Sequence, residues 1–550
     1  MAEVETYYYL NHFQRMLAEV IRLYEDLFDH EEDQFVASFL ALDRDAQCLF
    51  VRLVLRKGPF FRLDRIRYAE IAHLQLAYEQ LVDCALIEAS PVLTAFEIIK
   101  LFKKDELEQT ANALGLTDLP GKSQRKESWL TVLEREEELR STICAASLVF
   151  RRCKDDILKT FQMLYFGNYR QDLTSFITSQ LGVICFENYS LDRDIRLFDH
   201  RTDIDLAKLV GGMRDQLEWA RSHRLEEEIE AVAQRLLECS FSLSLPGFVV
   251  RSVDRMRYRL ALHFQKRKNW ALAIQLLSGC VLPPARERLA RIYLRLDDDV
   301  TAKRIVQEMQ ETPRGPDEWY FCHRGPTIPR HLKMRFDFES FELDLSYIGP
   351  VEQAVIQYFG DQRCFFTENV LWKSVLGLAI WDLMYLPIKG AFVNPFQSGP
   401  IDLFESTFYS SRRQSIDARL EAFLETPNRF KTQILSCAEE KKGLSNNLVN
   451  WDFVFQVPLE RIVDCISVSS WVGVFRQMIS NLRGYRTGFP DLMLLDPSDK
   501  PGLDVSTPFV FLEVKGPGDT LRPNQLTWIH KFCTLGIPFQ VVSVRKLPPQ

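Results

Sequence analysis

The segment that decides the fold reads GFPDLMLLD over residues 488–496, and it is followed after a loop by FVFLEVKGPGD over residues 509–519. Each part contains a short apolar run bounded by glycine or proline, which is typical of a buried strand. Asp491 precedes the first run, and Glu513 follows the second. Lys515 comes two residues after Glu513, so on a strand the two side chains lie on the same face. The sequence therefore predicts two strands that present two carboxylates and a lysine together.

This grouping suits metal-dependent hydrolysis of a phosphodiester. Asp491 and Glu513 carry the hard oxygen ligands that Mg²⁺ or Mn²⁺ prefers, and the main-chain carbonyl of Val514 is a further candidate ligand. Lys515 can orient a water and offset charge that grows on a phosphate oxygen. A proline before the aspartate and the spacing Glu-x-Lys make the pattern resemble the PD-(D/E)xK nuclease superfamily. We therefore expect a divalent-metal-dependent enzyme with two ions; the alternative is two amphipathic edge strands with solvated charges.

The residues after the second strand sharpen this resemblance. EVKGPGD followed by LRPNQLTWI, over residues 513–529, resembles the VRR-type nuclease domain as it occurs in the Fanconi-associated nuclease family. That family also carries a glutamate at the start of an upstream helix, and Glu368 in FTENVLW fits this position, with Thr367 as the expected N-cap. On physical grounds alone, an acid there complements the helix dipole. The resemblance implies that Glu368 is a catalytic residue and a metal ligand.

Three further residues near these motifs are candidates for contact with DNA. Arg486 and Arg522 flank the two strands and could clamp phosphates near the cut, although a single arginine is more often an ordinary surface residue. Gln525 begins the helix that follows the second strand, and it is a candidate to support the site, with a solvent-facing amide as the alternative.

The bulk composition is that of a protein with more than one globular domain, because 550 residues are 46% hydrophobic and 26% charged. A net charge of −7 argues against a basic surface all round but not against a local basic groove. Twelve cysteines without a CxxC pair favour reduced thiols over disulfides or zinc. The chain has no apolar run long enough to cross a bilayer and no signal-like start, so we expect no membrane partner. The expected location is the cytoplasm, at the nucleoid, if the source is bacterial, and the nucleus if it is eukaryotic.

Basic residues gather in one N-terminal stretch together with aromatic residues, as in surfaces that follow a phosphate backbone. The candidate DNA-binding residues there are Arg52, Arg56, Lys57, Arg62 and Arg65. Related nucleases carry a similar RKGPFF-like segment in their DNA-binding region. The alternative is a solvated helix face followed by a core-facing loop.

A second candidate DNA-binding element follows at residues 90–133, where two short helical patterns are separated by Pro120 and Gly121. This resembles a SAP module. Lys122, Arg125 and Lys126 precede its second helix, where the free N–H groups of the helix start also favour phosphate. A plain helical hairpin is the alternative.

The order of these patterns predicts a multidomain, mainly α protein. Between 134 and 330 the pattern Leu-Ala-x-x-aromatic occurs at 260 and again at 289, as in a degenerate tetratricopeptide-like repeat. The predicted domains are a helical DNA-binding domain at 1–89, the SAP-like module at 90–133, the helical repeats at 134–330, and an α/β PD-(D/E)xK nuclease domain at 331–550.

The resemblance implies a function as well as a fold. Members of the family cut DNA that carries a 5′ flap, act as 5′-to-3′ exonucleases and serve in DNA repair, including repair of interstrand crosslinks. We therefore expect branched or flapped DNA and repair proteins as partners. The chain shows no Cys-rich ubiquitin-binding finger like that of vertebrate relatives, which suggests a bacterial or short-form member.

Two residues depart from the pattern of the vertebrate relatives. Thr520 and Asn524 stand where vertebrate relatives carry basic residues that bind a 5′ phosphate, so we expect no strong dependence on that phosphate. The alternative functions are another PD-(D/E)xK enzyme, such as a junction resolvase or a restriction enzyme, and an inactive helical-repeat scaffold that binds DNA.

Overall fold

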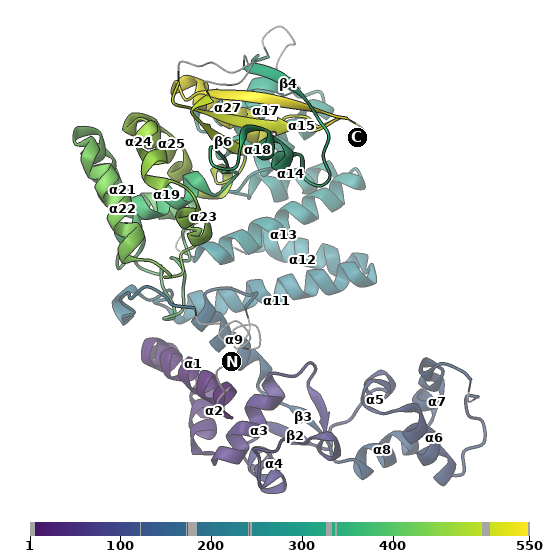
Figure 1. Ribbon diagram of the computed structural model, residues 1–550. Coiled ribbons are helices and arrows are strands. Elements are labelled where there is room, and N and C mark those ends of the chain that lie inside the picture. Colours follow the sequence, from purple (N-terminus) through teal and green to yellow (C-terminus); the bar gives the residue numbers. More distant parts are fainter. Residues whose placement is uncertain are drawn as a thin grey trace. The chain divides into compact units, whose positions relative to one another are not determined.

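The computed structural model describes residues 6–121, 123–171, 173, 184–239, 241, 245–325, 333–335, 338–497 and 507–547. The chain forms two compact units. The first comprises Met1–Val183 with Asp199–Ile204, and the second comprises Ile184–Phe198 with Asp205–Gln550. Helices dominate both units, and the strands are concentrated near the C-terminus, as predicted (Figure 1).

The first unit is built on amphipathic helices. Its helices are α1 (Tyr8–Tyr24), α2 (His30–Ala41), α3 (Arg44–Val54), α4 (Leu74–Asp83) and α9 (Asp155–Phe166). The α1 face that carries Phe13, Met16 and Val20 is fully buried, and α1 packs against α3 and α9. A small antiparallel sheet, in the order β1 (Phe60–Arg62), β3 (Val149–Arg152), β2 (Ile87–Ala89), joins segments far apart in the sequence.

The SAP-like segment forms a separate small core within this unit. Its helices are α5 (Ala95–Leu101), α6 (Lys104–Ala113), α7 (Trp129–Arg135) and α8 (Glu137–Ala146). Ile98, Leu107, Trp129 and Ile143 belong to one buried cluster. The packing therefore continues past residue 133 into α8.

The second unit begins with the helical repeats, which Figure 1 shows in blue-green. They are α11 (Arg201–His223), α12 (Glu226–Glu238), α13 (Gly247–Lys266), α14 (Trp270–Ser278), α15 (Ala285–Arg295), α16 (Asp299–Glu311) and α17 (Pro316–Arg324). Each of α12 to α17 packs on the next, and the seams bury Leu260, Phe264 and Leu289. The motif at 260 lies on α13, which packs on α14, and the motif at 289 lies on α15, which packs on α16, as expected for helical repeats.

A mixed five-stranded sheet forms the centre of the nuclease domain, in the order β4-β8-β7-β6-β5. The strands are β4 (Glu339–Leu345), β5 (Cys364–Phe366), β6 (Leu492–Leu495), β7 (Phe509–Lys515) and β8 (Phe539–Lys546). β4, β8 and β7 run parallel, whereas β6 is antiparallel to both β7 and β5. The two short apolar runs of the sequence are therefore neighbouring strands, as predicted.

Helices cover both faces of this sheet. α18 (Val351–Phe359) packs on the face that carries Leu512 and Val514. The opposite face, with Phe511, meets α19 (Leu371–Ala379) and α27 (Pro523–Thr534). This larger core also takes in the remaining helices, α20 (Trp381–Met384), α21 (Ser406–Glu425), α22 (Pro427–Glu440), α23 (Trp451–Gln456), α24 (Leu459–Cys465), α25 (Val468–Ser480) and α26 (Leu482–Tyr485).

Among the described residues, no single helix has the length and apolar character of a membrane span, and one pair, α24 with α25, reaches them only jointly across a bend of 97°.

Candidate active site

Asp491 and Glu513 lie at the same edge of the sheet because β6 and β7 are antiparallel, with Leu492 opposite Leu512. Asp491 stands just before β6, and its Oδ2 accepts a hydrogen bond from the Val514 N–H at 2.8 Å. Both carboxylates are buried, with 7% of Asp491 and 1% of Glu513 exposed. This degree of burial is rare for acids unless they are paired or bind a metal.

Lys515 and Gln525 hold the Glu513 carboxylate. Lys515 Nζ lies 2.7 Å from Glu513 Oε1, on the same face of β7, as the alternation of strand side chains predicts. The Gln525 amide donates to Glu513 Oε1, and its own Oε1 accepts from Lys515 Nζ at 3.4 Å and from the Arg522 N–H at 2.9 Å. The structure thus places Gln525 within the site.

Glu368 also reaches this edge, but not in the way the sequence predicts. α19 begins at Leu371 with Val370 at its N-cap, so the expectation that Thr367 caps the helix is wrong. Asn369 adopts a left-handed backbone with φ +53°, which folds residues 367–370 into a turn ahead of the helix. The N–H groups of Thr367 and Glu368 then donate to the Asp491 carbonyl at 2.8 and 3.1 Å. These long-range bonds bring Glu368 next to Asp491.

The carboxylates raise each other's affinity for protons. Burial raises the pKa of Asp491 to about 6. The charge of Glu368 adds to this rise, whereas the hydrogen bond from the Val514 N–H opposes it. Burial, and after it the charge of Asp491, raises the pKa of Glu513 to about 8 despite Lys515. Glu352 in the first turn of α18 adds to the effect on Asp491, and the sequence analysis missed it. An acid in a first helical turn is too common to single out from sequence.

Within the described ranges, no three His, Cys, Asp or Glu side chains are already arranged around a metal position. The donor set nevertheless fits Mg²⁺ or Mn²⁺, because it consists of carboxylate oxygens, and burial together with the charges of neighbouring acids raises the pKa values of Asp491 and Glu513.

The Val514 carbonyl lies on the side that a ligand requires. The Phe511 N–H donates to the Pro538 carbonyl at 2.9 Å, on the β8 side, while the Val514 N–H donates to Asp491 on the opposite side. Because the N–H and C=O of one strand residue point to the same side, the Val514 carbonyl points past the end of β6 towards Asp491.

Replacing Gln525 by alanine is expected to lower cleavage about 10- to 100-fold, the usual loss when a group that orients a metal ligand is removed. Glu513 and Lys515 would then lose the amide that fixes both. Mn²⁺ affinity and turnover should fall together, whereas Lys531→Ala on the same helix should change neither. Metal titration and single-turnover cleavage measure the two effects, and full activity of Gln525→Ala would reduce the amide to a helix cap.

The two candidate phosphate clamps lie close to this edge. Arg522 is exposed at the N-cap of α27, directly before the turn that holds Gln525. The Arg486 guanidinium lies over the Phe404 ring at 4.6 Å, in the segment that leads from α26 to Asp491. Their roles in DNA binding stay predictions.

The basic N-terminal stretch divides into two groups in the structure. The Arg52 guanidinium pairs with Glu70, and Arg62 pairs with Asp64 and Glu106 at 2.8 Å each. Arg65 shares Glu106. By contrast, Arg56 and Lys57 are exposed in the bend before β1, and the Arg56 guanidinium is 5.9 Å from the Phe61 ring centroid. Local charge patterns cannot show such distant carboxylate partners.

In the SAP-like segment, Arg125 is exposed and Lys126 is half-buried, with a pKa lowered by burial. Lys122 lies outside the described residues. All these N-terminal candidates belong to the first unit, whereas the carboxylates belong to the second.

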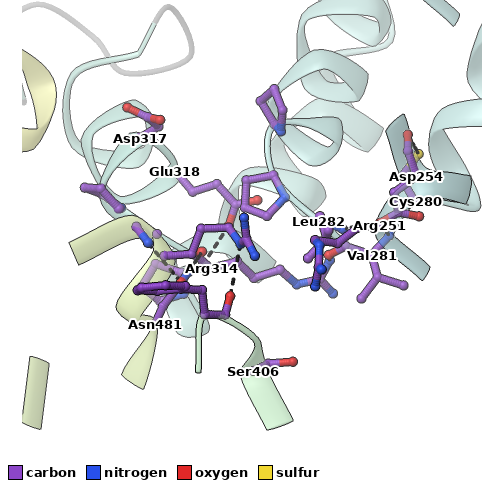
Figure 2. Close-up of a pocket in the computed structure, with 18 of the residues that line it drawn as sticks. Arg251, Asp254, Cys280, Val281, Leu282, Arg314, Asp317, Glu318, Ser406 and Asn481 are labelled. Atoms are coloured by element: carbon purple, nitrogen blue, oxygen red, sulfur yellow. Dashed lines mark hydrogen bonds between the residues drawn. The ribbon is translucent and has the colours of Figure 1, made fainter. Parts of the chain in front are cut away.

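A cavity of about 900 Å³ lies between α13, the segment 312–318 that leads into α17, and residues 480–487 (Figure 2). Its charged lining consists of Arg251, Arg255, Arg259, Arg314, Arg483, Asp254, Asp317, Glu318 and Glu405. Glu405 pairs with Arg251 and, at 2.8 Å, with Arg483. Asp254 accepts from the Val281 and Leu282 N–H groups at 2.9 and 2.8 Å. Acids therefore offset much of the positive charge of this cavity.

Comparisons with known proteins match the whole chain. Two family models fit, "FAN1, HTH domain" over residues 7–88 and "VRR-NUC domain" over residues 425–546. The chain is 29% identical to a Fanconi-associated nuclease 1 homolog of Pseudomonas aeruginosa, with 98% of this chain and 96% of the relative covered. It is 23% identical to Fanconi-associated nuclease 1 of Homo sapiens, where 98% of this chain but 62% of the relative is covered.

The fold is similar as well. A crystal structure of paFAN1 bound to 2nt 5′ flap DNA with gap superposes with a TM-score of 0.82 at 28% identity, covering 100% of both chains. A second crystal structure of paFAN1, bound to 1nt 5′ flap DNA with gap, gives a TM-score of 0.81.

Proposed function

We propose that this chain, which belongs to the Fanconi-associated nuclease family, cuts branched DNA that carries a 5′ flap and acts in DNA repair, including repair of interstrand crosslinks. The observation that carries this proposal is the cluster of Asp491, Glu513 and Lys515 at one sheet edge, with Glu368 beside it. 5′-to-3′ exonuclease activity is part of the same proposal, because a nuclease that cuts near a 5′ end can repeat the step along the strand.

The chain's own residues divide the chemical work. Asp491, Glu513 and Glu368, with the Val514 carbonyl, would hold Mg²⁺ or Mn²⁺, which when bound activates water and neutralises the phosphate. Lys515 positions the attacking water and stabilises charge on the phosphate oxygens. Gln525 keeps the Glu513 carboxylate and the Lys515 ammonium in register. Burial of both acids keeps bulk water from screening these charges.

The test of this function is a comparison of end-labelled 5′-flap, 3′-flap, duplex and single-stranded DNA in Mg²⁺, Mn²⁺ or EDTA. We expect the 5′ flap to be cut faster than the 3′ flap, a few nucleotides into the duplex, and only with a divalent ion. A preference for 3′ flaps, or cutting at a fixed sequence in unbranched duplex, would instead favour a resolvase or restriction type. Binding without cutting in every metal would favour the inactive scaffold.

The same assay tests dependence on the 5′ phosphate. Asn524 lines the arginine-bearing cavity, and Glu405 and Glu318 supply negative charge there. We therefore expect flaps that end in a phosphate or in a hydroxyl to be cut at similar rates.

Exposed cations of the first unit are proposed to contact duplex phosphates. Changing Arg56 and Lys57 together to glutamate should flatten the dependence of log affinity on log salt, because each lost contact removes roughly 0.9 from the slope. Lys159→Glu, which reverses an exposed lysine of α9, is the matched control. Titration of fluorescent junction DNA at several salt concentrations measures the slope, and an unchanged slope would remove these two residues from the DNA surface.

The paired arginines should behave differently. Arg62→Ala removes the buried cation that pairs with Asp64 and Glu106 and leaves them only the exposed Arg65, so it should lower stability more than it changes the salt slope. Arg52, Arg65, Arg125 and Lys126 stay candidate DNA contacts.

A further inference from the structure

Several of the described cations of the nuclease domain form no ion pair, and Lys373 and Arg486 are two of them. In the part of the chain that the structure describes, Lys373 on α19 and Arg486 after α26 form no ion pair, whereas Arg412, Arg419 and Arg483 of the same domain each do. Lys373 is also half-buried. A half-buried ammonium without an acid is unfavourable in the free protein.

The two positive charges lie on segments that are hydrogen-bonded to each other, since the Gly488 N–H donates to Asn369 Oδ1 at 3.0 Å. Burial, and after it the charge of Arg486, lowers the pKa of Lys373. Phe404 lies under the Arg486 guanidinium at 4.6 Å and so holds one of the two groups in place. Two like charges held together in this way favour an anion that contacts both.

The same two segments carry the catalytic acids at their other end. The Asp491 carbonyl accepts from the Glu368 N–H at 3.1 Å, and the Gly488 N–H donates to Asn369 Oδ1 at 3.0 Å. One segment therefore runs forward from 368 while its neighbour runs backward from 491. This antiparallel arrangement puts Lys373 and Arg486 on the same side of the two acids.

The spacing suits a neighbouring phosphate of the same DNA strand. Lys373 lies five residues after Glu368, beyond the turn at Asn369 and in the first turn of α19, and Arg486 lies five residues before Asp491. Phosphates of one strand advance by about 3.4 Å per nucleotide along the duplex axis. Each cation is thus a short chain segment away from an acid of the site, which suits a phosphate that neighbours the bond that is cut.

We propose that Lys373 and Arg486 together bind one phosphate of the cleaved strand close to the bond that is cut, and thereby position that bond at Asp491 and Glu513. This rests on the proposed nuclease function. Both residues are positioning residues, since they contact DNA away from the reacting atoms.

The experiment tests whether the effect of a protein substitution depends on one particular phosphate of the substrate. Flap DNAs are made in which one linkage at a time, along the strand that is cut, is a neutral methylphosphonate. Affinity is measured in EDTA, and KM and kcat are measured in Mn²⁺. The proteins are wild type, Lys373→Gln, the charge-conserving Lys373→Arg, and Lys531→Gln, which alters another half-buried lysine of the domain that has no acid partner.

For wild type, one neutral linkage near the cut should lower affinity about tenfold, the usual scale of a lost charge-assisted hydrogen bond. Lys373→Gln should show the same loss of affinity on natural DNA and no further loss on DNA with that neutral linkage. Lys373→Arg should again lose affinity when that linkage is neutral. KM should change more than kcat. Lys531→Gln should behave like wild type.

The inference would be overturned if the losses from Lys373→Gln and from the neutral linkage multiplied at every position. Equal effects of Lys373→Gln and Lys531→Gln would also overturn it. Because affinity is read in EDTA, a protein that shows the coupling but cuts no flap would contradict the nuclease function and leave the phosphate site supported. A protein that cuts 5′ flaps without the coupling would support the nuclease function and contradict the phosphate site.

Discussion

Alanine in place of Asp491, Glu513 or Lys515 is expected to lower cleavage more than about a hundredfold while DNA affinity in EDTA stays nearly unchanged. Asp491 and Glu513 are the buried acids of the site, and Lys515 is the cation that touches Glu513 at 2.7 Å. In the proposed mechanism each of them acts on the reacting phosphate, the ion or the water, whereas the proposed DNA contacts lie elsewhere. The loss should therefore fall on the chemical step.

Isosteric variants separate chemistry from folding in this test. Asp491→Asn keeps an oxygen that can accept from the Val514 N–H, so it should fold normally and still fail to cut. Asp496→Asn is the matched control at the other end of β6, where the carboxylate is exposed and pairs with Arg461. Single-turnover cleavage and binding by fluorescence anisotropy give the two readouts. Undiminished cutting by Asp491→Asn would remove this residue from the metal site.

Glu368→Gln belongs to the same series. The Glu368 N–H bond to the Asp491 carbonyl survives this change, so only the carboxylate charge is lost. We expect a sharp fall in activity. Full activity would instead make Glu368 a charge that merely raises the pKa of Asp491.

The core of this site could be predicted from the sequence because its geometry is local. Apolar runs between glycine and proline specify β6 and β7, and strand alternation alone puts Glu513 and Lys515 on one face. The turn at Asn369 could not be predicted, because it depends on hydrogen bonds to the Asp491 carbonyl more than a hundred residues away. With Thr367 as the expected N-cap, the sequence therefore predicts a start of α19 that lies before its actual first residue, Leu371.

Contacts between residues far apart in the sequence also explain what could not be predicted in the first unit. The sequence predicts helices there, but β1, β2 and β3 are strands of three or four residues whose pairing, such as Phe60 with Arg151, is far from local. Partners of Arg52 and Arg62 lie 18 and 44 residues away. Charge patterns indicate where cations gather but not which of them are already paired.

The second large effect concerns pH and the metal. Mn²⁺ affinity should fall about tenfold per pH unit from pH 8 to 6, because below its pKa of about 8 Glu513 holds a proton that an incoming ion must displace. Below pH 6 the fall should approach about a hundredfold per unit, since Asp491, with a pKa of about 6, then holds a second proton. Calorimetric titration with Mn²⁺ between pH 5.5 and 9 tests both slopes, and cleavage at fixed Mn²⁺ should follow them.

Stability of the metal-free protein should change with pH in the direction set by the same groups. A carboxyl whose pKa is raised on folding binds its proton more tightly in the folded state, so its favourable contribution is complete below the unfolded pKa and is lost as pH rises through the folded one. The metal-free protein should therefore unfold more easily at pH 9 than at pH 6. Mn²⁺ should reverse the trend, because an ion can replace the proton between the acids.

Glu513→Gln isolates the responsible group. A neutral amide cannot titrate, so the variant should lose the part of the pH dependence between about 6 and 8 and bind Mn²⁺ weakly at every pH. Thermal unfolding in EDTA and in Mn²⁺, for wild type and variant, measures both terms. If wild type and Glu513→Gln keep the same pH profile in EDTA, the buried carboxyl is not the group that titrates, and the competition between proton and metal at Glu513 is refuted.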